Sequence, residues 1–153
     1  MGAQQLLLIV LTVIIVGIAI SVGIYLFNYY NYKSNVQAIL AEMQHFAAMS
    51  QSYWASPISM GGASKNNDYC DTQQMASHLG FKEKYGAKII QITYFYISPN
   101  AEFHLEGSWN GILEINALGV AAFRGKYPYI NYKYDLNNDK PEIEITARKD
   151  WEE

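Results

Sequence analysis

The first 32 residues of this chain contain no charged side chain, and every Lys, Arg, Asp and Glu lies between Lys33 and Glu153. Within this uncharged part, residues 6–27 are apolar except for Thr12 and Ser21. A helix of these 22 residues, at roughly 1.5 Å per residue, is about 33 Å long, which is enough to cross the core of a bilayer. The stretch lacks the basic n-region of a cleavable signal peptide. The sequence therefore predicts a membrane segment joined to a water-facing domain.

Small residues recur at intervals of four within this apolar segment. Gly17 is followed by Ser21, and Ala19 is followed by Gly23. Residues four apart share one face of a helix, so each pair allows another helix to approach closely. We therefore expect Gly17, Ser21 and Gly23 to mark contacts between helices.

Aromatic residues gather where the apolar segment ends, at Tyr25, Phe27, Tyr29, Tyr30 and Tyr32. Tyrosine rings are amphipathic and settle at the depth of lipid headgroups. The cluster therefore predicts an aromatic belt at the membrane surface. Stacked rings that carry charge along a fibre are the alternative interpretation.

The helical pattern continues beyond the apolar segment. Apolar residues recur at steps of three and four from Val36 to Trp54, with polar residues on the other side. A Ser-Pro pair at 56–57 then ends the helix. We expect one helix from near the start to about Trp54, apolar all round in residues 1–27 and amphipathic in residues 28–54.

The rest of the chain is expected to form a short helix and then strands. Asp71 is a suitable N-cap and Gly80 a suitable C-terminal glycine, so residues 55–80 are predicted to be a loop and a short helix. Alternation of apolar and polar residues predicts strands at 89–97, 102–106, 109–116, 129–134 and 142–148.

The last of these strands shows the alternation most clearly. Ile143, Ile145 and Ala147 point to one face, and the residues between them, two glutamates and a threonine, point to the other. One face of the sheet is therefore expected to be wet, and the apolar side of the helix to cover the other.

The predicted fold class is α+β, with a long N-terminal α-helix packed on a four- to five-stranded antiparallel sheet. The first half of this helix is apolar and comprises residues 1–27. Residues 28–153 form the globular head, in which the sheet spans residues 88–148.

Composition argues against several classes of function. The net charge is −3 and the basic residues are dispersed, so nothing indicates nucleic-acid binding. Cys70 is the single cysteine and cannot close an intramolecular disulfide. We find no catalytic triad, phosphate-binding loop or pair of carboxylates, and we predict that the protein is not an enzyme and has no cofactor.

One segment near the C-terminus has the spacing of metal ligands. Asp135, Asn137 and Asp139 place oxygen atoms at alternate positions, as in the first half of a calcium loop. Such a loop has glycine at its sixth position and glutamate at its twelfth, where this chain has Lys140 and Thr146. We therefore favour a polar hairpin turn, with calcium as the alternative.

The order of these parts resembles that of type IV pilins and pseudopilins: an apolar helix extended into an amphipathic one, a loop, then an antiparallel sheet. The likeness covers the architecture of the whole chain, and residue by residue about its first 27 positions. In that family a peptidase removes a short basic leader, and the mature chain begins at an often methylated residue. The resemblance implies that Met1 is the mature first residue, which explains the uncharged start.

The chain departs from the family at position five. Most members have a glutamate there, whose carboxylate pairs with the N-terminal ammonium of a neighbouring subunit, whereas this chain has Gln5. An amide accepts a hydrogen bond from an ammonium but adds no Coulomb attraction. This implies a filament-tip variant or a lineage in which amide contacts suffice. The family's proline near position 22 is also absent, since Val22 and Gly23 stand there.

The resemblance implies assembly as the function. We expect a structural subunit of a type IV pilus-like extracellular filament at the cell surface, assembling through Met1, Gln5, Gly17, Ser21 and Gly23. Before assembly it is expected to be a single-pass membrane protein. The implied partners are copies of itself, the prepilin peptidase and the inner-membrane pilus assembly machinery. The alternative is a single-pass membrane-anchored binding domain that does not polymerise.

Overall fold

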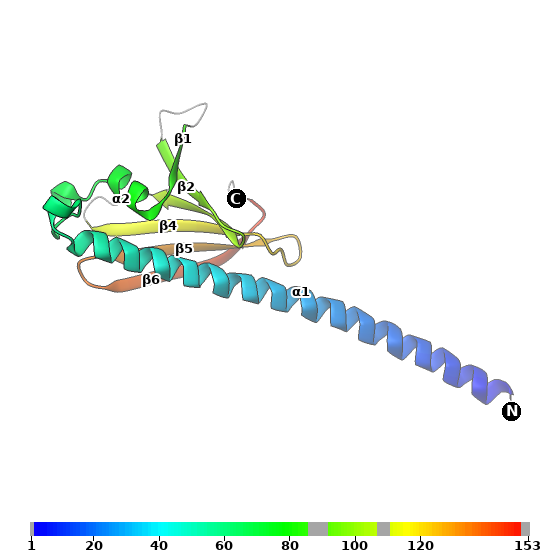
Figure 1. The fold of residues 1–153 in the computed structure, drawn as a ribbon. Coiled ribbons are helices and arrows are strands. Elements are labelled where there is room, and N and C mark those ends of the chain that lie inside the picture. The colour runs from blue at the N-terminus through cyan, green and yellow to red at the C-terminus, as the bar shows by residue number, and fades with distance from the viewer. Residues whose placement is uncertain (1, 86–91, 107–110, 151–153) are drawn as a thin grey trace.

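One helix, α1 (Gly2–Ala55), dominates the computed structural model, which describes residues 2–85, 92–106 and 111–150 (Figure 1). Its 54 residues confirm the predicted single long helix and give it a length of about 80 Å. The first half extends away from the rest of the chain, and the second half lies along the sheet. All of the buried residues of α1 belong to the second half: Asn35, Ile39, Met43, Phe46, Ala47, Ser50, Tyr53 and Trp54.

The end of α1 is fixed by the loop that follows it. A helix leaves its last four carbonyls without partners, and here backbone N–H groups of the loop return to them. Ala63 N donates to Tyr53 O at 3.1 Å, and Lys65 N donates to Trp54 O at 2.8 Å. The loop contains two short 3-10 turns, Ile58–Met60 and Asn67–Tyr69.

The predicted short helix is confirmed as α2 (Thr72–Leu79). Asp71 occupies the N-cap position. Gly80 follows the helix with a φ of 78°, in the left-handed region that glycine adopts without strain. Its N–H reaches the carbonyls of Ala76 and Ser77, as at many helix ends.

The sheet has six antiparallel strands in the order of the sequence, rather than the predicted four or five. It begins at residue 82 and not at 88. Parts of the predicted first and third strands, 89–91 and 109–110, lie outside the described residues. The strands are β1 (Lys82–Tyr85), β2 (Ile92–Ile97), β3 (Ala101–Glu106), β4 (Ile112–Gly119), β5 (Tyr127–Asp135) and β6 (Lys140–Arg148).

The core lies between α1, α2 and one face of the sheet. Phe46 of α1 is its centre, with its ring 5.2 Å from the ring of Phe81 and 5.3 Å from that of Phe103. Phe103, Ile115 and Ile130 are fully buried on the face of the sheet that α1 covers. The expected cover of the dry face by the amphipathic half of the helix is thus confirmed.

The last strand departs from the prediction that its apolar side is covered. In the register of β5 with β6, Ile143 lies opposite Tyr132 and Ile145 lies opposite Ile130, so both isoleucines are on the core side. They are nevertheless 45% and 49% exposed. The reason is that α1 packs mainly over β4 and β5 and not over this edge strand. Both faces of this edge strand are therefore exposed.

The helix packs tightly against the sheet where β4 ends. A Cβ atom on Gly119 would collide with Asn35 Oδ1 and lie 2.5 Å from Pro128 Cγ. The Asn35 side chain is buried and bonded on both sides, since its Nδ2 donates to Asn100 O at 2.8 Å and its Oδ1 accepts from Ala121 N at 3.2 Å. This asparagine ties α1 to two connections at the same end of the sheet.

We expect Gly119→Ala to lower the free energy of unfolding of the head by about 1–3 kcal/mol, because the added methyl group overpacks the contact with Asn35. Urea unfolding of the detergent-solubilised chain measures this. Gly23→Ala is the control, since a Cβ at Gly23 meets nothing within 4 Å. Equal free energies of unfolding for the two variants would show that the close contact at Gly119 does not affect the stability of the head.

Candidate functional site

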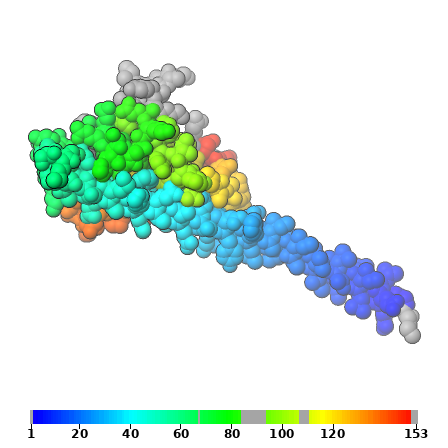
Figure 2. Space-filling model, viewed as in Figure 1, coloured from blue at the N-terminus to red at the C-terminus, as the bar shows by residue number. Residues whose placement is uncertain are grey.

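In the described part of the chain, no residue of the most apolar window of α1 is buried. Its large side chains from Leu6 to Phe27 are 43–71% exposed. By length and composition this helix could cross a membrane. Figure 2 shows the segment projecting from the head as a free rod. A continuous apolar surface of this size needs lipid or protein around it.

The two polar side chains inside this segment are satisfied by the helix itself. Thr12 Oγ1 donates to Leu8 O at 2.7 Å, and Ser21 Oγ donates to Gly17 O at 2.9 Å. Each hydroxyl proton therefore has a partner four residues earlier and does not require water. The segment is compatible with apolar surroundings over its whole length.

The glycines of the segment make no close contact with the described part of the head. A Cβ at Gly17 or at Gly23 would meet no atom within 4 Å. At about 100° per residue, the pair Gly17 and Ser21 lies about 200° around the helix from the pair Ala19 and Gly23. The predicted small residues thus form two patches on nearly opposite sides of α1, and each patch is open.

The predicted residues at the start of the helix are placed less completely. Gln5 lies exposed in the first turns of α1. Met1 lies outside the described residues, so the expected contact between its amino group and a neighbouring Gln5 stays a prediction.

The predicted aromatic belt divides into two sides. The rings of Tyr25, Tyr29 and Tyr32 lie 5.4, 5.6 and 6.2 Å from the ring of Phe123, which belongs to the connection between β4 and β5. Phe27 and Tyr30 point elsewhere and are exposed. Three of the five rings therefore bind part of the head, and contact of the belt with lipid stays a prediction.

Sequence reasoning missed Phe123 and its neighbour Arg124. The guanidinium group of Arg124 lies 5.6 Å from the ring centre of Tyr25 and 5.5 Å from that of Phe123. These distances suit cation–π attraction. No local pattern pairs residues almost a hundred positions apart, so only the folded chain reveals this contact.

The segment predicted to be a hairpin turn or a calcium loop connects β5 and β6 as a turn. The carboxylate of Asp135 accepts hydrogen bonds from Asn137 N and from Asn138, and these bonds hold the pKa of Asp135 below its usual value, the Asn138 side chain contributing most. Asp139 accepts a hydrogen bond from the Tyr134 hydroxyl. In the described part of the chain, no three His, Cys, Asp or Glu side chains are grouped to hold a metal ion.

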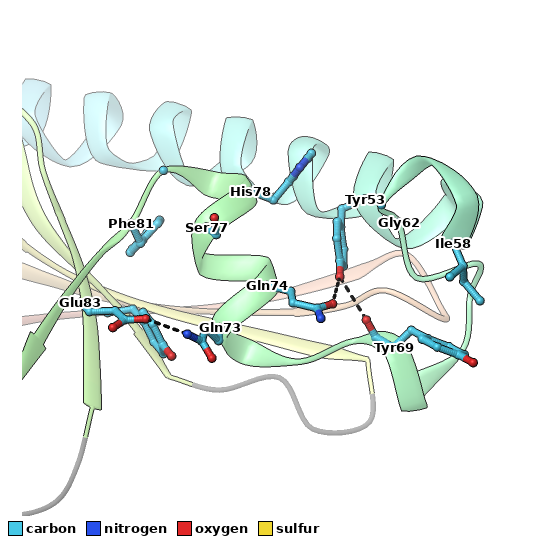
Figure 3. Close-up of a pocket in the computed structure, with 13 residues that line it drawn as sticks. Tyr53, Ile58, Gly62, Tyr69, Gln73, Gln74, Ser77, His78, Phe81 and Glu83 are labelled. Atoms are coloured by element: carbon cyan, nitrogen blue, oxygen red, sulfur yellow. Dashed lines mark hydrogen bonds between the residues drawn. The ribbon is translucent and has the colours of Figure 1, made fainter.

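No sequence motif indicates a cleft, yet the structure has one of about 930 Å³ between the end of α1, α2 and the start of the sheet (Figure 3). The Tyr53 hydroxyl lies in it, 3.0 Å from Gln74 Oε1 and 3.1 Å from Tyr69 O. Gln73 Nε2 donates to Glu83 Oε1 at 3.1 Å on the opposite wall. These polar groups are thus paired with one another, whereas Ser77 and His78 also line the cleft, which is open to solvent.

Comparisons of this chain with models of protein families, with curated proteins and with solved structures found no match.

Millimolar calcium is expected to leave the melting temperature of the chain unchanged, because the oxygen atoms of Asp135 and Asp139 are engaged within the turn. Thermal unfolding with calcium and with a chelator measures this. A calcium-dependent rise that disappears in Asp139→Asn would instead establish the loop as a metal site.

Alkaline pH is expected to weaken the same turn through Tyr134. Burial, and then the hydrogen bond to Asp139, raise the pKa of Tyr134 to about 12. Because the folded-state pKa exceeds the ordinary value of 10.0, this contribution to stability is complete below pH 10 and is lost as the pH rises towards 12. Thermal unfolding across this range should show a smaller pH-dependent loss in Tyr134→Phe than in the parent chain. Identical profiles would contradict the assignment.

Proposed function

We propose that this chain is a structural subunit of a type IV pilus-like filament, assembled through the apolar half of α1. The observation that carries the proposal is the projecting helix of residues 6–27, whose large apolar side chains are 43–71% exposed although the helix continues unbroken into a packed head. A surface of this kind fits two surroundings in turn, lipid before assembly and neighbouring helices afterwards.

The two patches of small residues favour a polymer over a simple dimer. A helix that pairs with one neighbour needs one close-packing face, whereas Gly17 with Ser21 and Ala19 with Gly23 offer two on nearly opposite sides. A helix inside a bundle is contacted from several directions. The arrangement of small residues is therefore the one expected at the centre of a fibre.

The energetics of assembly favour packing as the driving force. Each large apolar side chain gains about 1.5–3 kcal/mol when it leaves water, but lipid supplies most of that gain already. The loss of lipid contacts when α1 leaves the bilayer is then offset by close contact between helices at the small residues and by hydrogen bonds. Gln5 supports this, because its amide, like that of Gln4 before it, adds hydrogen-bonding groups to an uncharged start without the cost of a buried charge.

The head is proposed to form the outer coat of the filament. All charged side chains of the chain lie in it or at its junction with α1, from Lys33 onwards. The proposed site of the finished subunit is an extracellular filament at the cell surface, with a single-pass membrane stage before it. The proposed partners are copies of the chain, a prepilin peptidase and the inner-membrane assembly machinery.

A second candidate function is that of a membrane-anchored binding domain that does not polymerise. The observation in its favour is the open cleft beside Tyr53, which offers aromatic walls and polar side chains. In that case α1 would need only hydrophobicity, and the patches of small residues would tolerate large residues.

Gly17→Leu separates the two candidates. Because the leucine fills one patch and blocks close approach, we expect filaments to be lost while membrane insertion stays normal. Electron microscopy of surface material and carbonate extraction of membranes measure the two properties. Ile14→Leu is the matched control, as it changes shape but not size within the same segment, and it should retain filaments.

Normal fibres from Gly17→Leu would contradict the role of this patch. A parent chain found only as a solitary helix surrounded by lipid, under conditions of full expression, would contradict polymerisation itself and favour the anchored domain.

A further inference from the structure

We propose that the connection between β4 and β5, residues 120–126, rests on the membrane surface and binds the phosphate groups of anionic lipids. The inference rests on the membrane stage of the proposed function, in which residues 6–27 span the bilayer. It adds a second contact with the membrane, made by the head.

The depth of this connection follows from its contacts with α1. Phe123 lies 5.4 Å from Tyr25, ring centre to ring centre, and Tyr25 is two residues from the end of the apolar segment. The main attachment of the head, at Asn35, is about 15 Å further along the helix. Residues 120–126 therefore reach along α1 to the level at which, in the proposed function, the helix leaves the membrane. Figure 2 shows the gold part of the chain beside the helix at this end of the head.

The geometry of the tip is fixed. Phe123 N donates to Lys126 O at 2.9 Å, and Lys126 N donates to Phe123 O at 3.2 Å, so the two residues close a hairpin with Arg124 and Gly125 at its end. Arg124 and Gly125 have φ values of 53° and 73°. Two positive φ angles in succession are typical of a tight type I′ turn. The start of the connection is held as well, by the hydrogen bond from Ala121 N to Asn35.

The side chains of the connection suit the boundary between lipid and water. Val120 and Ala122 are apolar and exposed, and Phe123 is half-buried among the tyrosines. Arg124 and Lys126 follow, and both are exposed. Exposed apolar residues next to basic ones are the composition of segments that lie on anionic membranes.

The basic side chains of the connection are not paired with acidic ones in the described part of the chain. Among residues 2–85, 92–106 and 111–150, neither Arg124 nor Lys126 makes an ion pair, unlike Lys133, which pairs with Glu114. Lys33 adds a third basic group on the adjacent part of α1, 5.0 Å from the ring centre of Tyr29. Three cations thus lie beside the predicted headgroup region, where the phosphates of anionic lipids would attract them.

The test places the full-length chain in vesicles that contain a photoreactive probe, either phosphatidylglycerol or phosphatidylcholine, and maps cross-linked peptides by mass spectrometry. We expect residues 120–126 to be labelled, and more strongly by the anionic probe. The double variant R124Q/K126Q should reduce anionic labelling about fivefold for each charge removed. The matched control K65Q/K140Q removes equal charge at the opposite end of the head and should change nothing.

Carbonate extraction of the same vesicles reports insertion of α1 separately. If α1 is inserted and residues 120–126 are unlabelled, or are labelled equally by both probes, this inference is overturned while the proposed function stands. If α1 does not insert, the membrane stage of the proposed function fails, and the inference fails with it.

Discussion

The packing of the second half of α1 against β4 and β5 determines the rest of this structure. Between Asn35 and Trp54 the helix presents one apolar stripe, and the sheet presents the matching face centred on Phe103. Because the helix is continuous, fixing its second half also fixes the direction in which the first half leaves the head. The exposure of residues 6–27 is therefore a consequence of the core and not an independent feature.

The boundary between the two halves is built from specific contacts. Asn35 is the last buried residue of α1 on the way to the N-terminus, and both ends of its amide are bonded to the backbone of the head. Below it, the head touches the helix through Phe123 and the three tyrosines around it. The hydrogen bonds of Asn35 and the ring contacts of Phe123 together give the junction a defined geometry. Both a membrane anchor and a filament subunit require this.

Local patterns in the sequence predicted much of this fold. The long helix and α2 were predicted with accurate ends, because periodicity, Pro57 and Gly80 act within a few residues. The strand β1 was missed, since Lys82–Tyr85 is mostly charged, which is usual for an edge strand but hides the alternation. The apolar side of β6, which includes Ile143, was wrongly predicted to be covered. An alternating pattern shows which side of a strand is apolar, but not whether another element covers that side. Phe123 and the cleft beside Tyr53 depend on residues distant in sequence, for which no local signal exists.

The unbroken backbone of α1 couples the motions of its two ends. No proline interrupts the 54 residues between Gly2 and Ala55, so rotation of one end is transmitted to the other. Membrane helices commonly tilt by about 20°, and over a length of about 80 Å such a tilt displaces the far end by about 27 Å. Small adjustments of the apolar segment are thereby converted into large changes in the position of the loop beyond Ala55.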